Sequence, residues 1–240
     1  DSTKTSIEAY REAMTAIAGA AGPDAYILAC GAPILPSIGI AHGIRIGPDV
    51  AFYNLPLEWR YVKAEVLNLA TRHFLWPAIA PDPDAALIRD LPENEARFFL
   101  SAALMAPGIF AIGDNLPALP PDRLDFYRRV ARLIPLLYDA TPGTQFNAVP
   151  NLFEHPARIL PKTNLEPYIV PGSFPIPPVW IRKAGDTTIV TLLNGEDTSQ
   201  SVQVDLEARG IKGRWNVEEI FSGEKSMVTK TLTADLSPRE

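Results

Sequence analysis

The chain has 240 residues, 47% of them hydrophobic, and carries a formal net charge of −6 at neutral pH. A hydrophobic fraction of this size supports a substantial buried core, which excludes a largely disordered chain. The acidic balance, without any run of lysine or arginine, argues against nucleic acid or an anionic membrane as a partner. We therefore expect a neutral small molecule as the ligand.

The cellular location is predicted from what the sequence lacks. Cys30 is the single cysteine, so no intrachain disulfide can form. The N-terminal residues do not show the basic-then-apolar pattern of a secretion signal, and no apolar stretch is long enough to cross a bilayer. These features predict a cytoplasmic protein. The sequence opens on Asp1 and not on methionine, which leads us to expect a truncated chain.

Strand-like and helix-like segments alternate over residues 1–140. The two kinds of segment differ in how their apolar residues are spaced. Helical spacing marks residues 6–18, 57–75, 93–105 and 121–138, and short apolar strand patterns mark residues 24–31, 38–46, 84–90 and 108–115. Strands that alternate with helices form parallel sheets through right-handed crossovers. The order therefore predicts an α/β fold, either a barrel or an open doubly wound sheet of the flavodoxin type.

The pattern changes near residue 140. Short alternating runs separated by glycine-containing turns follow one another between residues 179 and 233. This spacing is typical of an antiparallel sandwich. We predict two parts: a partial (β/α) barrel over residues 1–140, and a linker with an antiparallel β-sandwich domain over residues 141–240.

The residues expected at the loop edge of the barrel lie at or beside the ends of the four predicted strands. They are Cys30 with Gly31, then Asp49, then Asp82 with Asp84, then Asp114, so three of the four positions carry a carboxylate. The carboxyl ends of parallel strands meet at one edge, where barrel enzymes carry their chemistry. Gathered carboxylates suit proton transfer, binding of sugar hydroxyls or metal ligation. The alternative for each aspartate is that it caps the following helix.

Arg45 and Asp49 flank a Gly-Pro pair, so both side chains can reach this edge if the strand ends near Ile46. The alternative for Arg45 is a surface ion pair, and for His42 a hydrogen-bonded structural histidine. The three histidines lack metal-binding spacing, and the phosphate-binding, dinucleotide-binding and serine-hydrolase motifs are absent. We therefore expect neither a metal nor a cofactor.

The segment ACGAPILPSIGIAHGIRIGPDV, residues 29–50, resembles the melibiase-type α-galactosidases of glycoside hydrolase clan D, family 36. The family pattern runs Cys-Gly-small-Pro, then a glycine, then Arg-Ile-Gly-Pro-Asp, and this last element is the most specific part of the resemblance. PDPDAALIR (81–89), GDNLPAL (113–119) and the C-terminal alternating runs are also similar to the family. The resemblance covers nearly the whole chain.

The resemblance implies a retaining hydrolase of terminal α-galactosides. By it, Asp49 is the acid/base, Arg45 contacts the substrate and the nucleophile, and Cys30, Gly31 and His42 line the pocket, with Asp82, Asp84 and Asp114 in support. The family's nucleophile lies in a Lys-x-Asp element on an earlier strand, which this chain lacks. The four units then form the second half of a (β/α)8 barrel, and the isolated chain is expected to be inactive.

Three departures from the family pattern affect the expected substrate. His42 stands where the family usually has an aspartate, Pro81 stands where it has an asparagine, and Trp76 is spaced differently from Asp82. Two alternatives to the hydrolase also stay open: a galactosyl transferase of the same clan, and a non-catalytic carbohydrate-binding protein. An open half barrel also exposes strand edges, which predicts pairing with the missing half or a homo-oligomer.

Overall fold

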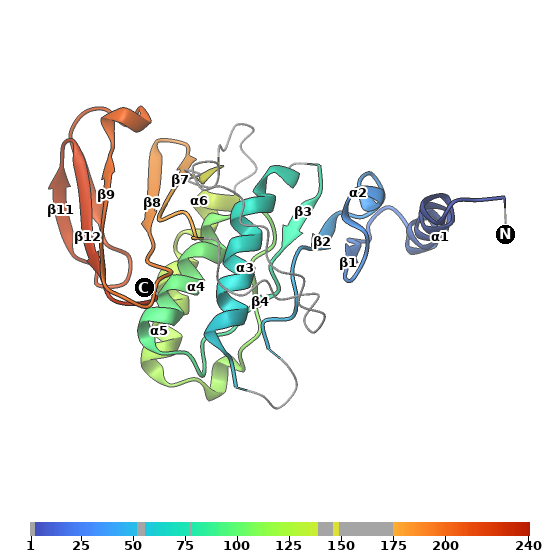
Figure 1. The fold of residues 1–240 in the computed structure, drawn as a ribbon, viewed down its shortest axis with the longest axis horizontal. Helices are drawn as coiled ribbons and strands as arrows, with labels where there is room; N and C mark the ends of the chain where they lie inside the picture. Colours follow the sequence, from blue (N-terminus) through green and yellow to red (C-terminus); the bar gives the residue numbers. More distant parts are fainter. Residues whose placement is uncertain (1–2, 52–55, 77, 139–145, 149–174) are drawn as a thin grey trace, which may run out of the picture.

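The structure is a computed structural model that describes residues 3–51, 56–76, 78–138, 146–148 and 175–240. Helix α1 (Ser6–Ala21) lies at one end of the molecule, parallel strands with their helices form the middle, and antiparallel strands form the other end (Figure 1). The predicted boundary at residue 140 falls outside the described residues.

The predicted helices are present, but two of the predicted ranges are divided. The range 57–75 ends in a 3-10 turn at residues 73–75, and the range 121–138 is two helices, because Pro135 has no N–H to continue the backbone ladder. None of the described helices combines the length and apolar character required to cross a membrane. Besides α1, the α-helices are α2 (Ile34–Ser37), α3 (Trp59–Arg72), α4 (Glu93–Met105), α5 (Pro121–Ala131) and α6 (Ile134–Tyr138), and short 3-10 turns occupy η1 (His73–Leu75), η2 (Leu116–Ala118) and η3 (Glu207–Arg209).

The strands of the middle part are short and parallel, as an α/β fold requires. One sheet has the order β1-β2-β3, and β4 pairs separately with β5. The strand predicted at residues 84–90 is reduced to β4, and a strand that was not predicted, β3, precedes it; Asp84 separates the two, because its φ of 77° turns the backbone out of the extended conformation. The strands are β1 (Leu28–Ala29), β2 (Gly43–Arg45), β3 (Ala80–Asp82), β4 (Ala85–Ala86) and β5 (Ala111–Ile112).

Helices α3 and α4 pack against these strands, and the outer strands β1 and β5 are only partly covered by the described residues. The main hydrophobic core joins the inner faces of α3 and α4 to the strands. Leu28 of β1 is 44% exposed and Ile112 of β5 is 39% exposed, whereas parallel sheets are normally covered on both faces. Closure of the sheet into a barrel remains a prediction.

Helix α1 extends from this body without burying any of its residues (Figure 1). A reciprocal pair of hydrogen bonds between Thr5 and Glu8 caps its N-terminus. Its contacts with α2 include a 2.6 Å hydrogen bond between the hydroxyls of Tyr10 and Ser37. Ile7 and Ile17, predicted to form part of an apolar face, are each 55% exposed.

The strands of the C-terminal part are all antiparallel. A core of valine, leucine and isoleucine side chains lies between the β7–β8 strands and the remaining pairs. The alternating run predicted at residues 227–233 is shared between two strands. The pairs are β6 (Phe146–Ala148) with β7 (Val179–Ala184), β7 with β8 (Thr187–Leu192), β9 (Gln200–Asp205) with β12 (Thr231–Leu236), and β10 (Trp215–Glu218) with β11 (Lys225–Val228).

Arg182 of β7 joins the two parts of the structure. Its side chain is buried and donates hydrogen bonds to the carbonyl oxygens of Leu104 and Ala106 at 3.3 Å, at the C-terminus of α4. It also donates to the carbonyl of Leu137 in α6. A cation at a helix C-terminus satisfies carbonyls that the helix leaves without partners and complements the helix dipole.

We predict that Arg182→Met lowers the free energy of unfolding by about 2–4 kcal/mol, because several buried carbonyls lose their donor together. Chemical denaturation monitored by circular dichroism measures the change. The neighbouring Lys183 is exposed, so Lys183→Met is the matched control and should shift stability by less than about 0.5 kcal/mol. Equal effects of the two substitutions would contradict this role for Arg182.

Candidate active site

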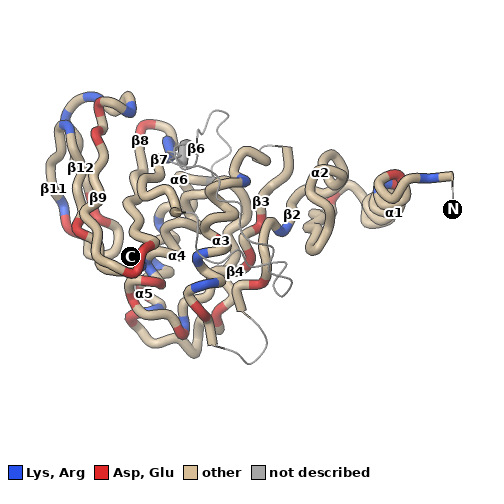
Figure 2. Tube along the Cα trace, in the orientation of Figure 1, with Lys and Arg blue, Asp and Glu red and all other residues tan. Residues whose placement is uncertain are grey.

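Arg45, the last residue of β2, binds three carboxylates at once. Its Nε donates to Asp82 at 3.0 Å, one terminal nitrogen lies 2.9 Å from Asp49, and the other lies 2.8 Å from Asp84. All three carboxylates follow or end parallel strands, so they meet at the carboxyl edge, as predicted for them. Basic and acidic positions lie side by side around β2, β3 and β4 in Figure 2.

Backbone contacts fix the segment that carries Arg45 and Asp49. The N–H of Ile46 donates to the carbonyl of Asp82 at 3.0 Å, which continues the pairing of β2 with β3. The N–H of Val50 donates to the Asp84 carboxylate at 2.9 Å. Residues 46–50 are therefore held at both ends, by the last residue of β3 and by Asp84 just after it. Asp49 lies between these two hydrogen bonds.

Asp84 occupies a left-handed backbone conformation that few residues other than glycine adopt. Aspartate tolerates it better than most because its short carboxylate can bond locally. Its own N–H donates to Asp82 at 3.0 Å, and its carboxylate accepts from the N–H of Ala85 at 2.8 Å. These bonds orient both carboxylates toward Arg45 before any ligand arrives.

The three carboxylates differ in exposure, which separates their roles. The side chain of Asp82 is 3% exposed and that of Asp84 17%, whereas that of Asp49 is 59% exposed. Burial lowers the pKa of Arg45, but the hydrogen bond and charge of Asp82, with the charges of Asp84 and Cys30, raise it overall. Arg45 therefore stays charged, and Asp49 is the carboxylate that a ligand can reach.

Cys30 and Gly31 lie at the same edge, directly after β1. The Cys30 side chain is exposed and close enough to Arg45 to affect its pKa. Gly31 has a φ of 67°, so a side chain there would strain the turn that leaves β1. The structure brings both residues to the carboxyl edge with Arg45.

Asp114 is placed apart from the Arg45 cluster by its hydrogen bonds. Its side chain is fully buried and accepts from the N–H of Ile88 at 2.7 Å and the hydroxyl of Tyr127 at 2.8 Å. Arg89 lies 3.3 Å from its other oxygen. Burial and the Asp114 charge raise the pKa of the Tyr127 hydroxyl. These contacts tie β5 to the chain beyond β4 and to α5, and they are not the helix cap that the alternative predicts, since neither η2 nor α5 has a side-chain cap.

His42 lies at the opposite, amino-terminal end of β2, about 10 Å from Arg45 at the usual rise per strand residue. Its Nδ1 accepts from the N–H of Ile27 at 3.0 Å, and its ring stacks on Tyr26 with centroids 5.2 Å apart. With Trp76 these rings line a cavity of about 570 Å³. His42 therefore makes the structural hydrogen bond that its alternative role predicts. It does not lie with Asp49 in the Arg45 cluster.

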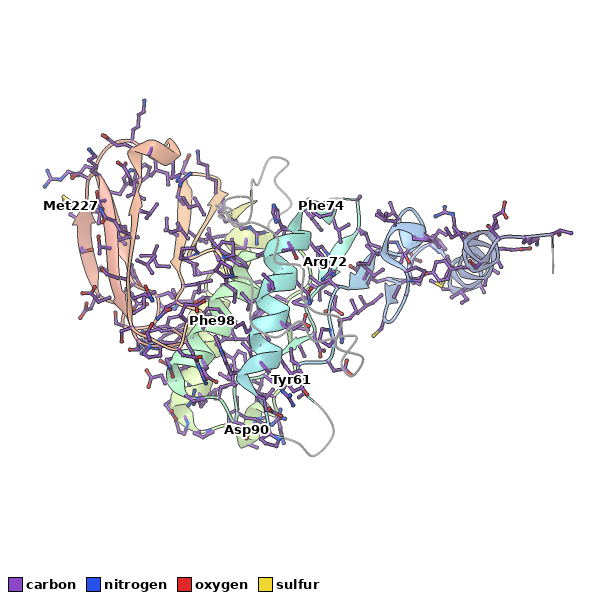
Figure 3. The ribbon with its side chains drawn as sticks, in the orientation of Figure 1. Tyr61, Arg72, Phe74, Asp90, Phe98 and Met227 are labelled. Carbon is purple, nitrogen blue, oxygen red and sulfur yellow. The ribbon has the colours of Figure 1, made fainter. Side chains whose placement is uncertain are left out.

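Sequence reasoning missed three polar residues of α3 that lie behind the site. Arg72 donates to the carbonyl of Ile46 at 2.8 Å, and Figure 3 shows it on the side of α3 toward β3. Glu65 and Asn68 occupy the space beside Gly47 that a Cβ would need, which explains the glycine at this position. Their spacing of three and four residues places them on one helix face and was the available signal.

No group of three or more histidine, cysteine, aspartate or glutamate side chains is arranged to hold a metal ion within the part of the chain that the structure describes. The three carboxylates around Arg45 face its guanidinium, whose positive charge occupies the position that a cation would need. The cluster therefore presents an arginine with an exposed acid, which can bind hydroxyl groups and transfer protons.

Comparison with solved structures finds this fold in glycosidases. One is a GH27 β-L-arabinopyranosidase from Geobacillus stearothermophilus in complex with arabinose, with a TM-score of 0.70 and 13% identity over 96% of this chain and 53% of that chain. Another is α-galactosidase I from Mortierella vinacea, with a TM-score of 0.66 and 12% identity over 98% of this chain and 62% of that chain. The chain thus spans little more than half of each.

At this identity the likeness establishes a shared fold. The chain has the α/β fold of α-galactosidase-like glycosidases, with antiparallel sheets after the parallel strands. No protein-family model matches it. The assignment to family 36 within clan D therefore remains a prediction.

We predict that Arg45→Met lowers the free energy of unfolding by about 3–5 kcal/mol, because the buried Asp82 loses its counter-charge. Arg45→Lys should recover only part of the loss, since a lysine cannot present a fork of donors to several carboxylates. Urea denaturation measures both. Lys225→Met removes an exposed ion pair with Glu218 and serves as the control, with an expected change below about 1 kcal/mol. An Arg45→Met protein as stable as this control would contradict the cluster's structural role.

Proposed function

We propose that the chain is the acid/base-bearing part of a retaining glycoside hydrolase that acts on terminal α-galactosides. The observation that carries the proposal is the exposed Asp49 carboxylate held by Arg45, which is itself fixed by the more buried Asp82 and Asp84. The Arg-Ile-Gly-Pro-Asp resemblance and the glycosidase fold support the same assignment.

Asp49 acts first as an acid and then as a base in this mechanism. It donates a proton to the glycosidic oxygen as the bond to the anomeric carbon breaks, and it later takes a proton from the water that releases the sugar. The position at the end of β2 suits this role because the side chain is accessible while its backbone is held on both sides. Cys30 and Gly31 form the neighbouring wall of the proposed pocket.

Arg45 orients Asp49 and recognises the substrate. Three of its contacts are taken by carboxylates, and the guanidinium has donors beyond these for a sugar hydroxyl or a nucleophile. Because its position is set by buried partners, Arg45 needs little rearrangement when a sugar binds. This preorganisation lets its charge act on the transition state without first ordering the side chain.

The nucleophile is proposed to come from outside the 240 residues. A retaining mechanism needs a second carboxylate about 5 Å from the acid/base, on the other side of the anomeric carbon. The nearby Asp82 and Asp84 are committed to Arg45. The partly exposed outer strands β1 and β5 and the partial coverage of the matched structures support a further half that supplies it.

The test compares Asp49→Asn with the unchanged sequence in a longer chain that includes the upstream strands. We expect hydrolysis of an alkyl α-galactoside to fall by about 10²–10⁴-fold, because a poor leaving group needs the acid. A nitrophenyl α-galactoside, whose leaving group needs less protonation, should lose less in the bond-breaking step. Initial rates and pre-steady-state bursts measure both substrates.

Asp24→Asn is the matched control, because Asp24 is an exposed aspartate that precedes the amino end of β1, whereas the cluster lies at the carboxyl ends of the strands. It should leave both rates unchanged. Equal losses for the two leaving groups, or no loss at all in Asp49→Asn, would show that Asp49 is not the acid. Product analysis with excess acceptor sugar separates hydrolysis from galactosyl transfer.

A further inference from the structure

Glu65 is a fully buried carboxylic acid in the middle of α3, directly behind the segment that carries Arg45 and Asp49. It is 0% exposed, and neither of its carboxylate oxygens has a hydrogen bond of ordinary geometry within the described residues. A buried carboxylate without partners is very unfavourable, whereas the neutral acid is much less so. Buried polar groups of this kind call for a physical explanation.

The Glu65 side chain contacts the backbone at Gly47, midway between Arg45 and Asp49. A Cβ on Gly47 would collide with both carboxylate oxygens and with the side-chain amide of Asn68. Gly47 does not have a positive φ, so the glycine is required by this close approach and not by backbone conformation. Glu65 thus sets how closely α3 approaches the segment.

The charges around Glu65 come from three elements. The charge of Asp84, after β3, disfavours the ionised form, whereas the charges of Arg45 of β2 and Arg72 of α3, and the uncharged side-chain amide of Asn68 as a donor, favour it. The two arginines are engaged elsewhere: Arg45 with its three carboxylates and Arg72 with the carbonyl of Ile46. An ionised Glu65 would compete for both arginines and so disturb the contacts that hold the segment.

We propose that Glu65 is a positioning residue that, as an uncharged acid, holds the Arg45–Asp49 segment against α3 and keeps both arginines on their present partners. Loss of its proton draws Arg45 and Arg72 toward it and loosens the segment. The catalytic consequence rests on the proposed function of Asp49, but the contact and its proton dependence are properties of the fold.

The pH dependence follows from the folded and unfolded states. Burial, reinforced by Asp84, raises the pKa of Glu65 to about 9 from its ordinary value of 4.5. Between these values the folded chain keeps a proton that the unfolded chain has lost, so stability falls as pH rises. One such proton changes the folding equilibrium constant by about tenfold per pH unit.

The first experiment measures unfolding in urea from pH 5 to pH 9 for the unchanged chain and for Glu65→Gln. Glutamine keeps the shape of the neutral acid and has no proton to lose. The unfolding equilibrium constant of the variant should therefore change less steeply with pH than that of the unchanged chain, by about tenfold per pH unit. Glu93→Gln, at an exposed position of α4, is the control and should keep the original dependence. An unchanged slope in Glu65→Gln would overturn the proposal.

The second experiment tests the contact itself with a double-mutant cycle. Gly47→Ala should be strongly destabilising, and Glu65→Ala should relieve part of that loss in the double variant because it removes the colliding carboxylate. Gly19→Ala, in open space on α1, is the matched control and should be near neutral. Additive effects at positions 47 and 65 would contradict the contact. If Gly47→Ala does not fold, the urea series decides alone.

A third readout separates this inference from the proposed function. In a longer, active chain, loss of the Asp49 proton makes the rate decline first in both proteins, and a further decline above about pH 9 should appear in the unchanged sequence and be absent in Glu65→Gln. An active enzyme whose rate profile above about pH 9 is identical in the variant would refute the positioning role and leave Asp49 as the acid. A chain that never hydrolyses glycosides, yet shows the altered unfolding slope, would refute the proposed function and keep the role of Glu65.

Discussion

The pairing of Arg45 with Asp82 is the interaction on which the site depends. Asp82 is almost fully buried, and a carboxylate in that position requires a counter-charge. Arg45 supplies the counter-charge from the neighbouring parallel strand and uses its other nitrogens for Asp84 and Asp49. The need to neutralise one buried aspartate therefore determines where the accessible aspartate lies.

The two ends of the short strands carry different groups. Arg45, the carboxylates around it and Cys30 lie at the carboxyl ends, whereas Tyr26, His42 and Trp76 line a cavity at the amino ends. Strands of two or three residues are enough to separate these groups, because each residue adds about 3.3 Å along the strand. The separation explains why His42 is held by the backbone of Ile27 and not by the cluster.

Much of the fold could be predicted from local patterns. Apolar spacing gave α3 and α4 within a few residues, and the alternating runs gave the antiparallel strands. The break at Asp84 could not be predicted, because a left-handed aspartate depends on bonds to Ala85 and Val50 that form only in the folded chain. The exposure of α1 was also missed, since a helical pattern does not say what covers its apolar face.

The candidate site could likewise be predicted where local sequence patterns determine it, and not where contacts between distant segments determine it. The strand-end rule and the family resemblance together singled out Arg45, Asp49, Asp82 and Asp84, and the structure brings these residues together. Asp114 satisfies the same rule, yet Tyr127 and Ile88 bind it away from the cluster. Glu65 could not be identified from the sequence, because its role depends on a contact with Gly47, which lies on another segment of the chain.

The most direct test of the account is hydrolysis of an aryl α-galactoside by the 240-residue chain alone and by the same chain combined with the upstream half that carries a Lys-x-Asp strand. We predict no turnover from the chain alone and clear turnover when such a half is present, because the proposed acid/base and a nucleophile would then face each other. Robust turnover by the chain alone would contradict it and would place the nucleophile among the carboxylates of these 240 residues.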